Sequence, residues 1–221
     1  MPKKEQPAKE PEAWALRPCP KQGDNNLPGL YESIGRVLSQ WERYDGTLSL
    51  LFGAFMGSDI PHAARRAYSA VRTFEGRLDM LRAVTEAYFA EKPNQDLSDQ
   101  WISILKQATR FSERRNEIAH GSVAHFIEDF SNPPIPLPAQ YCLYPSYAVF
   151  KKRDLNSVPE YCYTTIELDY FYEQFSKLIN PVSELAGAIL QERRTASLKK
   201  QYARYLASEN QDNPNINSQD T

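Results

Sequence analysis

Apolar residues recur at spacings of three and four along most of the chain, as they do in helices that bury one face. This pattern predicts helices over residues 28–56, 60–90, 99–120 and about 168–194. The basic segment 193–205 is compatible with a continuation of the last helix. Because short connections join antiparallel neighbours, we expect an up-down bundle of four to five helices and a mainly α fold.

The pattern changes after the third predicted helix. Residues 131–138 hold four prolines and cannot be helical. Residues 141–150 and 160–167 are rich in aromatic and β-branched side chains, which predicts two strands. We therefore expect a β-hairpin insert at about 140–167, between helices three and four.

The ends of the chain differ in composition from its middle. Residues 1–26 are rich in proline, lysine, glutamate and asparagine, which predicts a flexible N-terminal arm, although Trp14 and Leu16 are candidates to dock on the domain. Residues 206–221 are polar and predict a disordered C-terminal tail. A chain of 221 residues suggests one domain, so we expect a single helical domain over 27–205.

Charge and cysteine content restrict the classes of function. The net charge of −2 provides no overall attraction for nucleic acid, so RNA binding would need a local patch. Three scattered cysteines, Cys19, Cys142 and Cys162, argue against a disulfide framework and against a zinc site. We expect reduced thiols, and a bridge between Cys142 and Cys162 across the hairpin is the minority alternative. The sequence lacks a run of about 18 apolar residues and the apolar core of a signal peptide, so the predicted location is cytoplasmic, with no membrane contact.

The third predicted helix ends in the motif Arg115-Asn116-x-x-x-His120, which Gly121 follows. Glycine suits the left-handed residue that often ends a helix. His120 would then lie in the last turn, where the negative end of the helix dipole would raise its pKa. The forked donors of arginine suit phosphate, and a histidine that titrates near neutral pH suits proton transfer. The motif therefore has side chains that suit phosphodiester cleavage.

This motif resembles the R-polar-x-x-x-H signature of the HEPN superfamily, a group of helical domains common in prokaryotic toxins and defence systems. The resemblance covers the motif and the helical arrangement over about residues 27–194. It implies a metal-independent endoribonuclease without a cofactor, in which a ribose 2′-hydroxyl attacks phosphorus and leaves a 2′,3′-cyclic phosphate. It also implies catalytic roles for His120 as general acid or base, Arg115 as the group that stabilises phosphoryl charge, and Asn116 as an orienting amide.

The spacing of the motif bears on its assembly. Arg115 and His120 are five residues apart, so their directions on one helix differ by about 140°. In HEPN ribonucleases, two motif helices are thought to pair across a two-fold axis. We therefore expect a homodimer with a composite site. A toxin would also have a neutralising protein partner, as in toxin–antitoxin systems.

Other basic residues are candidates for RNA binding: Arg114, Arg193, Arg194, Lys199 and Lys200. The alternative for Arg114 is pairing with Glu113 or Glu117, and the alternative for the basic run is a solvated helix end.

Two other readings of the whole chain stay open. One is a non-catalytic HEPN-like module that binds RNA, nucleotide or a protein partner. The other is a helical interaction protein in which His120 only caps its helix. His62 and His125 are more simply read as structural or solvated, and with His120 they do not make a convincing metal site.

Overall fold

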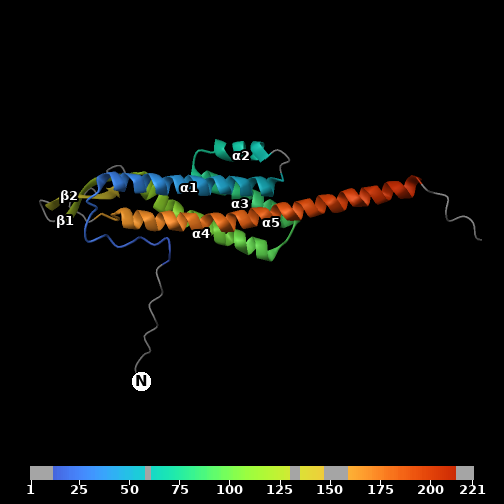
Figure 1. Cartoon of the computed structure of the whole chain (residues 1–221). Helices are drawn as coiled ribbons and strands as arrows, with labels where there is room; N and C mark the ends of the chain where they lie inside the picture. Colours follow the sequence, from blue (N-terminus) through green and yellow to red (C-terminus); the bar gives the residue numbers. More distant parts are fainter. Residues whose placement is uncertain (1–11, 58–60, 130–134, 147–158, 213–221) are drawn as a thin grey trace, which may run out of the picture. The chain divides into compact units, whose positions relative to one another are not determined.

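The computed structural model describes residues 12–57, 61–129, 135–146 and 159–212. Its elements, in chain order, are α1 (Leu27–Met56), α2 (Pro61–Ala70), α3 (Phe74–Glu91), α4 (Gln95–Ala119), β1 (Gly121–Asp129), β2 (Ile135–Pro145) and α5 (Thr165–Asp212) (Figure 1). The predicted helical bundle with an inserted hairpin is confirmed. The hairpin lies between the fourth and fifth helices, because the predicted second helix is two helices.

The chain packs into two compact units. One unit comprises residues up to 47 together with 99–181, and the other comprises 48–98 together with the chain from 182 onward. Both α1 and α5 contribute residues to each unit. The single domain expected over 27–205 stays a prediction.

Aromatic rings from three helices form much of the core of the first unit. The Phe175 ring of α5 packs edge-on against Trp41 of α1, with centroids 5.0 Å apart, and against Phe111 of α4, with centroids 5.8 Å apart. All three side chains are buried. Such edge-to-face pairs add to the stabilisation from burial. This packing fixes the helix that carries the sequence motif.

The hairpin pairs β1 with β2 in antiparallel register, from Gly121 opposite Pro145 to His125 opposite Tyr141. Residues 141–145 are therefore strand as expected, but their partner is 121–129 and not 160–167. From the second expected strand, Tyr163 forms an isolated bridge with Leu143. Residues 147–150 of the first expected strand lie outside the described residues. The boundaries of the insert at about 140–167 were wrong, because register shifts between His125 and Ile127 and between Ile127 and Asp129 interrupt the alternation of β1.

A disulfide joins Cys142 of β2 to Cys162, with Cα atoms 6.1 Å apart. The prediction of reduced thiols is therefore wrong for this pair. Cys19 is free and exposed. The bridge ties the segment before α5 to the hairpin, and that segment carries side chains of the site described below.

The arm before α1 packs on the first unit. Trp14 contacts Phe111 edge-on with ring centroids 6.0 Å apart, as expected for docking, whereas Leu16 is 46% exposed. The backbones of Asp24 and Tyr141 exchange two hydrogen bonds of 2.8 Å. Residues of the arm therefore contact the first unit, and the flexibility of the arm stays a prediction. Residues 1–11 lie outside the described residues.

The second unit shows why the predicted helix 60–90 is interrupted. The Thr73 hydroxyl accepts a hydrogen bond of 3.2 Å from the Gly76 backbone, which makes Thr73 the N-cap of α3. Arg77 donates to the Val71 carbonyl at 2.8 Å. In the core of this unit, the rings of Phe55 and Tyr88 lie 5.2 Å apart.

Both ends of α5 differ from expectation. The helix begins at Thr165, where the Asp24 carboxylate accepts from the Thr165 backbone and hydroxyl at 2.8 Å. It continues through Pro181 to Asp212, so the tail predicted over 206–221 is helical as far as 212. Residues 213–221 lie outside the described residues. Among the helices of the described ranges, none combines the length and the apolar character needed to cross a membrane.

Candidate functional site at the end of α4

The motif occupies the last two turns of α4. Its last member, His120, directly follows the final helical residue, and its backbone N–H still donates to the Asn116 carbonyl at 3.0 Å. The helical geometry therefore extends to His120. The side chains of Asn116 and His120 are exposed. On one chain, Arg115 and His120 consequently keep the separation of about 140° that the helix imposes.

Gly121 ends the helix for a different reason from the one expected. The positive-φ glycine of the described residues is Gly57, so the prediction of a left-handed Gly121 is wrong. Gly121 instead begins β1. A Cβ atom at this position would lie 2.6 Å from Leu143 Cδ1 and 3.0 Å from the Glu117 carbonyl oxygen. Glycine is needed here because β2 approaches the helix end closely.

Arg115 is held in place from two sides. One terminal nitrogen lies 3.3 Å from Glu42 Oε1 of α1, and the other donates to Asn116 Oδ1 at 3.2 Å. Within the described residues, its Nε is buried without a hydrogen-bond partner, as is the Nε of Arg114. The side chain is 29% exposed. Asn116 therefore orients Arg115, and the terminal nitrogens, which carry two N–H groups each, keep donor capacity for an anion.

Arg114 points the other way and is only 8% exposed. Its guanidinium lies 2.8 Å from Glu117 Oε1 and 3.5 Å from Glu113 Oε2. These contacts favour the alternative in which Arg114 pairs with neighbouring carboxylates. Arg114 is a structural residue of the inner face of α4, and we remove it from the candidate RNA contacts.

Glu117 connects Arg114 to the segment before α5. The Tyr163 hydroxyl donates to Glu117 Oε2 at 2.5 Å, and the Tyr161 hydroxyl donates to the Glu117 carbonyl at 3.0 Å. The pKa of Glu117 is raised, mainly by burial and also by the charges of Glu113 and Glu160, while Tyr163 and Arg114 oppose the rise. Burial and the nearby Glu117 charge raise the pKa of Tyr163, which keeps its phenol protonated as a donor. We call Arg114, Glu117, Tyr161 and Tyr163 the inner cluster; sequence reasoning missed its two tyrosines.

The basic residues of α5 lie in the other unit and are of two kinds. Arg193 is partly buried, donates to the Phe55 carbonyl at the end of α1 and lies 5.3 Å from the Tyr88 ring centroid. It caps α1 and is therefore structural. The other candidates, Arg194, Lys199 and Lys200, are exposed.

The two other histidines do not join the motif. His125 is exposed and stacks on Tyr141 with ring centroids 5.0 Å apart, and His62 is exposed on α2. In the part of the chain that the structure describes, no group of three histidine, cysteine, aspartate or glutamate side chains is placed to hold a metal ion.

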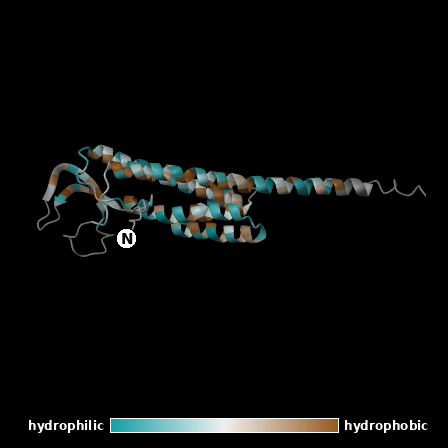
Figure 2. Ribbon diagram, turned by 90° about the horizontal axis from the view of Figure 1, so that it is seen from below, coloured by the Kyte–Doolittle hydropathy of each residue, from teal (hydrophilic) through white to brown (hydrophobic). Residues whose placement is uncertain are grey.

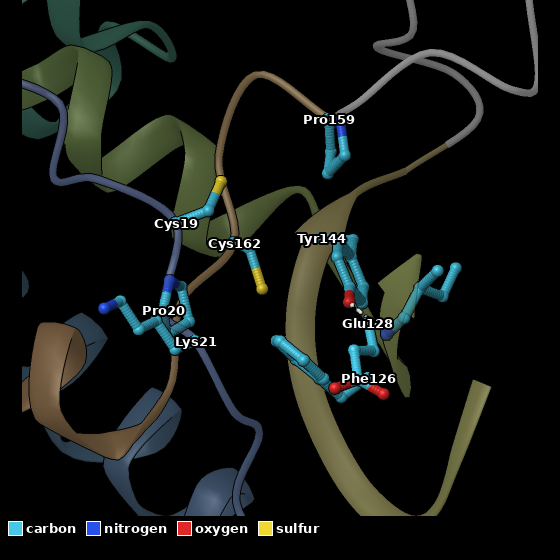
Figure 3. Close-up of a pocket in the computed structure, with 9 residues that line it drawn as sticks. Cys19, Pro20, Lys21, Phe126, Glu128, Tyr144, Pro159 and Cys162 are labelled. Atoms are coloured by element: carbon cyan, nitrogen blue, oxygen red, sulfur yellow. Dashed lines mark hydrogen bonds between the residues drawn. The ribbon is translucent and has the colours of Figure 1, made fainter. Parts of the chain in front are cut away.

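A pocket of about 320 Å³ lies elsewhere in the first unit (Figure 3). Cys19 and Lys21 of the arm, Phe126 of β1, Tyr144 of β2 and Cys162 contribute to its lining. None of its lining residues belongs to the motif. This pocket is therefore separate from the candidate site, whose exposed side chains lie on the surface of α4.

Comparisons of the chain with protein-family models, with curated proteins and with solved structures found no match. The assignment of function therefore depends on the chemistry of the motif and its surroundings.

Proposed function

We propose that this protein is a metal-independent endoribonuclease of HEPN type that acts as a toxin or defence effector. Its active site is composite and forms where the motif helices of two copies meet in a homodimer. RNA is the substrate, and the products carry 2′,3′-cyclic phosphate and 5′-hydroxyl ends. Cytoplasmic action and a neutralising protein partner belong to the same proposal.

The observation that carries the proposal is the state of the motif side chains. His120 and Asn116 are exposed on the last turn of α4, and Arg115 is oriented by Asn116 with terminal N–H groups left over. Arg114, the adjacent cation, is instead buried in an ion pair. The two arginines thus divide into one that stabilises the helix end and one available to a phosphate.

The chemistry follows from these groups. One His120 accepts the proton of the ribose 2′-hydroxyl while that oxygen forms a bond to phosphorus. The bond from phosphorus to the 5′-oxygen breaks, and the leaving oxygen takes a proton from water, so that one His120 serves each site. Arg115 stabilises the negative charge that grows on the non-bridging oxygens.

The dimer is a requirement of this chemistry. Since Arg115 and His120 diverge by about 140° on one helix, a single chain does not aim both at one phosphate. A two-fold axis beside the end of α4 would place the His120 of one copy beside the Arg115 of the other, and would do so twice in each dimer.

One observation favours a second candidate, a non-catalytic HEPN-like module that binds RNA. Arg115 is paired with Glu42, and such a pair is also a plain structural contact between two helices. In this case the motif would stabilise the packing of α4 on α1, and RNA would bind elsewhere.

RNA cleavage by the purified full-length protein in the presence of EDTA tests the proposal. Wild type is compared with His120→Ala, and the matched control is His125→Ala, which removes an exposed histidine five residues further on. Cleavage by wild type and the control, but not by His120→Ala, with cyclic phosphate ends, is the expected result. Equal cleavage by all three would mean that the site is wrong, and no cleavage by any of them would favour the binding module.

A further inference from the structure

The C-terminal part of α5 exposes every side chain from Arg194 to Leu206. We call residues 194–206 the basic extension. It contains four cations, Arg194, Lys199, Lys200 and Arg204, and no aspartate or glutamate. A helix of this length spans about 20 Å. In Figure 2, hydrophobic and hydrophilic residues alternate along this part of α5.

The exposed apolar side chains of the basic extension lie on one side of the helix. At 100° per residue, Leu198, Tyr202 and Leu206 fall within an arc of about 80°, whereas Lys200 and Arg204 lie on the opposite side. Tyr202 is 65% exposed and Leu198 is 57% exposed. Lys199 and Arg194 lie about 60° and 80° from Tyr202, one on each side, so the extension presents an aromatic ring with a cation on each flank.

We propose that the basic extension is a docking surface for single-stranded RNA. Charge complementarity identifies the partner as a polyanion, because four cations without a carboxylate would repel the same helix of a second copy. The exposed tyrosine distinguishes single strands from duplexes, since its ring stacks on unpaired bases that a duplex does not offer. The choice of RNA rests on the proposed function, but the inference concerns capture of RNA and not its cleavage.

Arg193 marks where the docking surface begins. Its guanidinium is committed to the Phe55 carbonyl and the Tyr88 ring, so it stabilises the base of the extension and does not reach a ligand. The RNA contacts are assigned to Arg194, Lys199, Lys200 and Arg204, with Tyr202 as the stacking residue.

The test measures binding of the full-length His120→Ala chain, which leaves RNA intact, to a fluorescent single-stranded RNA of mixed sequence by anisotropy. The extension variant adds Lys199→Gln, Lys200→Gln and Arg204→Gln, all helix-compatible changes. The charge-matched control adds Arg65→Gln, Arg66→Gln and Arg72→Gln in exposed positions at and beyond α2. Circular dichroism checks that the helices persist.

The extension variant should bind RNA at least about tenfold more weakly than its parent. Its slope of log affinity against log salt concentration should become less negative by about 2. The control should bind within about twofold of its parent, because surface charges far from the contact are screened. Tyr202→Ala should weaken binding about fivefold or more with an unchanged salt slope, and Tyr202→Phe should retain binding.

Three results would overturn the inference. The extension variant could bind RNA as tightly as its parent, the control could lose as much affinity as the extension variant, or the parent could bind duplex RNA as tightly as single-stranded RNA. The inference would also be overturned if binding to phosphatidylserine vesicles depended on the extension and binding to RNA did not. Binding that depends on the extension in a protein that never cleaves RNA would remove the proposed nuclease and leave this inference intact. RNA cleavage that does not depend on the extension would overturn this inference and leave the proposed nuclease intact.

Discussion

The inner and outer faces of the last two turns of α4 use the same kinds of residue for different purposes. On the inner face, Arg114 and Glu117 pair at 2.8 Å, and Tyr163 donates to the same carboxylate. On the outer face, Asn116 and His120 are exposed, and Arg115 makes one longer contact with the 62%-exposed Glu42. The inner face anchors the helix end, and the outer face presents groups to a ligand.

This difference explains how a motif on the surface of a helix stays ordered. Arg114 and Arg115 are neighbours in sequence but point about 100° apart on the helix. The buried partner of Arg114 makes its loss costly, whereas the solvated pair of Arg115 is easily exchanged for a phosphate. Stability and chemistry should therefore respond to different substitutions.

The largest expected effect is that of Arg114→Ala. It leaves Glu117 without its cation in a largely buried site, which should lower the free energy of unfolding by about 3 kcal/mol. Urea unfolding measures this loss. Arg110→Ala is the control, because the Arg110 side chain is 55% exposed and its pair with Glu113 is 3.7 Å long, so we expect a change below about 0.5 kcal/mol. Equal losses in the two variants would contradict the division into faces.

Removing the disulfide should have the next largest effect. Cys142 and Cys162 are 20 residues apart in sequence, and opening such a loop should destabilise the protein by about 3 kcal/mol. Reduction also loosens the segment that carries Tyr161 and Tyr163. Thermal unfolding measures the effect in two ways: by comparing wild type with the double variant Cys142→Ala/Cys162→Ala, and by comparing wild type with and without dithiothreitol. Cys19→Ala is the control. An unchanged melting temperature on reduction of wild type would show that the bridge does not form.

Gly121→Ala and Gly35→Ala should act in opposite directions. A methyl group on Gly121 meets Leu143 Cδ1 at 2.6 Å, so we expect a loss of about 1–3 kcal/mol from overpacking. Nothing lies within 4 Å of the same position on Gly35, in the middle of α1, so alanine there should stabilise by up to about 1 kcal/mol. Chemical unfolding of both variants gives the signs. A neutral Gly121→Ala would mean that β2 lies further from the helix end.

The smallest expected effect on stability, and a selective one on binding, is that of Glu42→Gln. The exposed pair contributes at most about 1 kcal/mol, so unfolding should barely change. Release of Arg115 should tighten RNA binding about two- to fivefold in the His120→Ala background. Glu32→Gln removes the same charge from an exposed position of α1 and serves as the control. Equal tightening by both variants would indicate a general charge effect and not a contact with Arg115.

Sequence reasoning succeeded where one local pattern decides the structure. The apolar stripe predicted α1 to within a residue, and the motif lies at a helix end as predicted. It missed the break before α3, because Val71 continues the apolar spacing while the Thr73 cap interrupts the helix.

Long-range partners could not be predicted in this way. The hydrogen bond from Tyr163 to Glu117 joins residues 46 positions apart, and nothing in either neighbourhood marks the pair. Pairing of Arg114 with Glu117 was an open alternative, but its burial depends on the segment before α5. The same segment carries Cys162, so the disulfide was underestimated for the same reason.

The most direct test of the central claim, that two copies share one active site, is complementation between two inactive variants. Arg115→Ala and His120→Ala are purified separately, mixed so that subunits exchange, and assayed for RNA cleavage with EDTA present. The account predicts no cleavage by either variant alone and a return to about a quarter of wild-type activity in the mixture, because half of the dimers then hold one intact site. A mixture as inactive as its components, although the subunits exchange, would contradict a shared site.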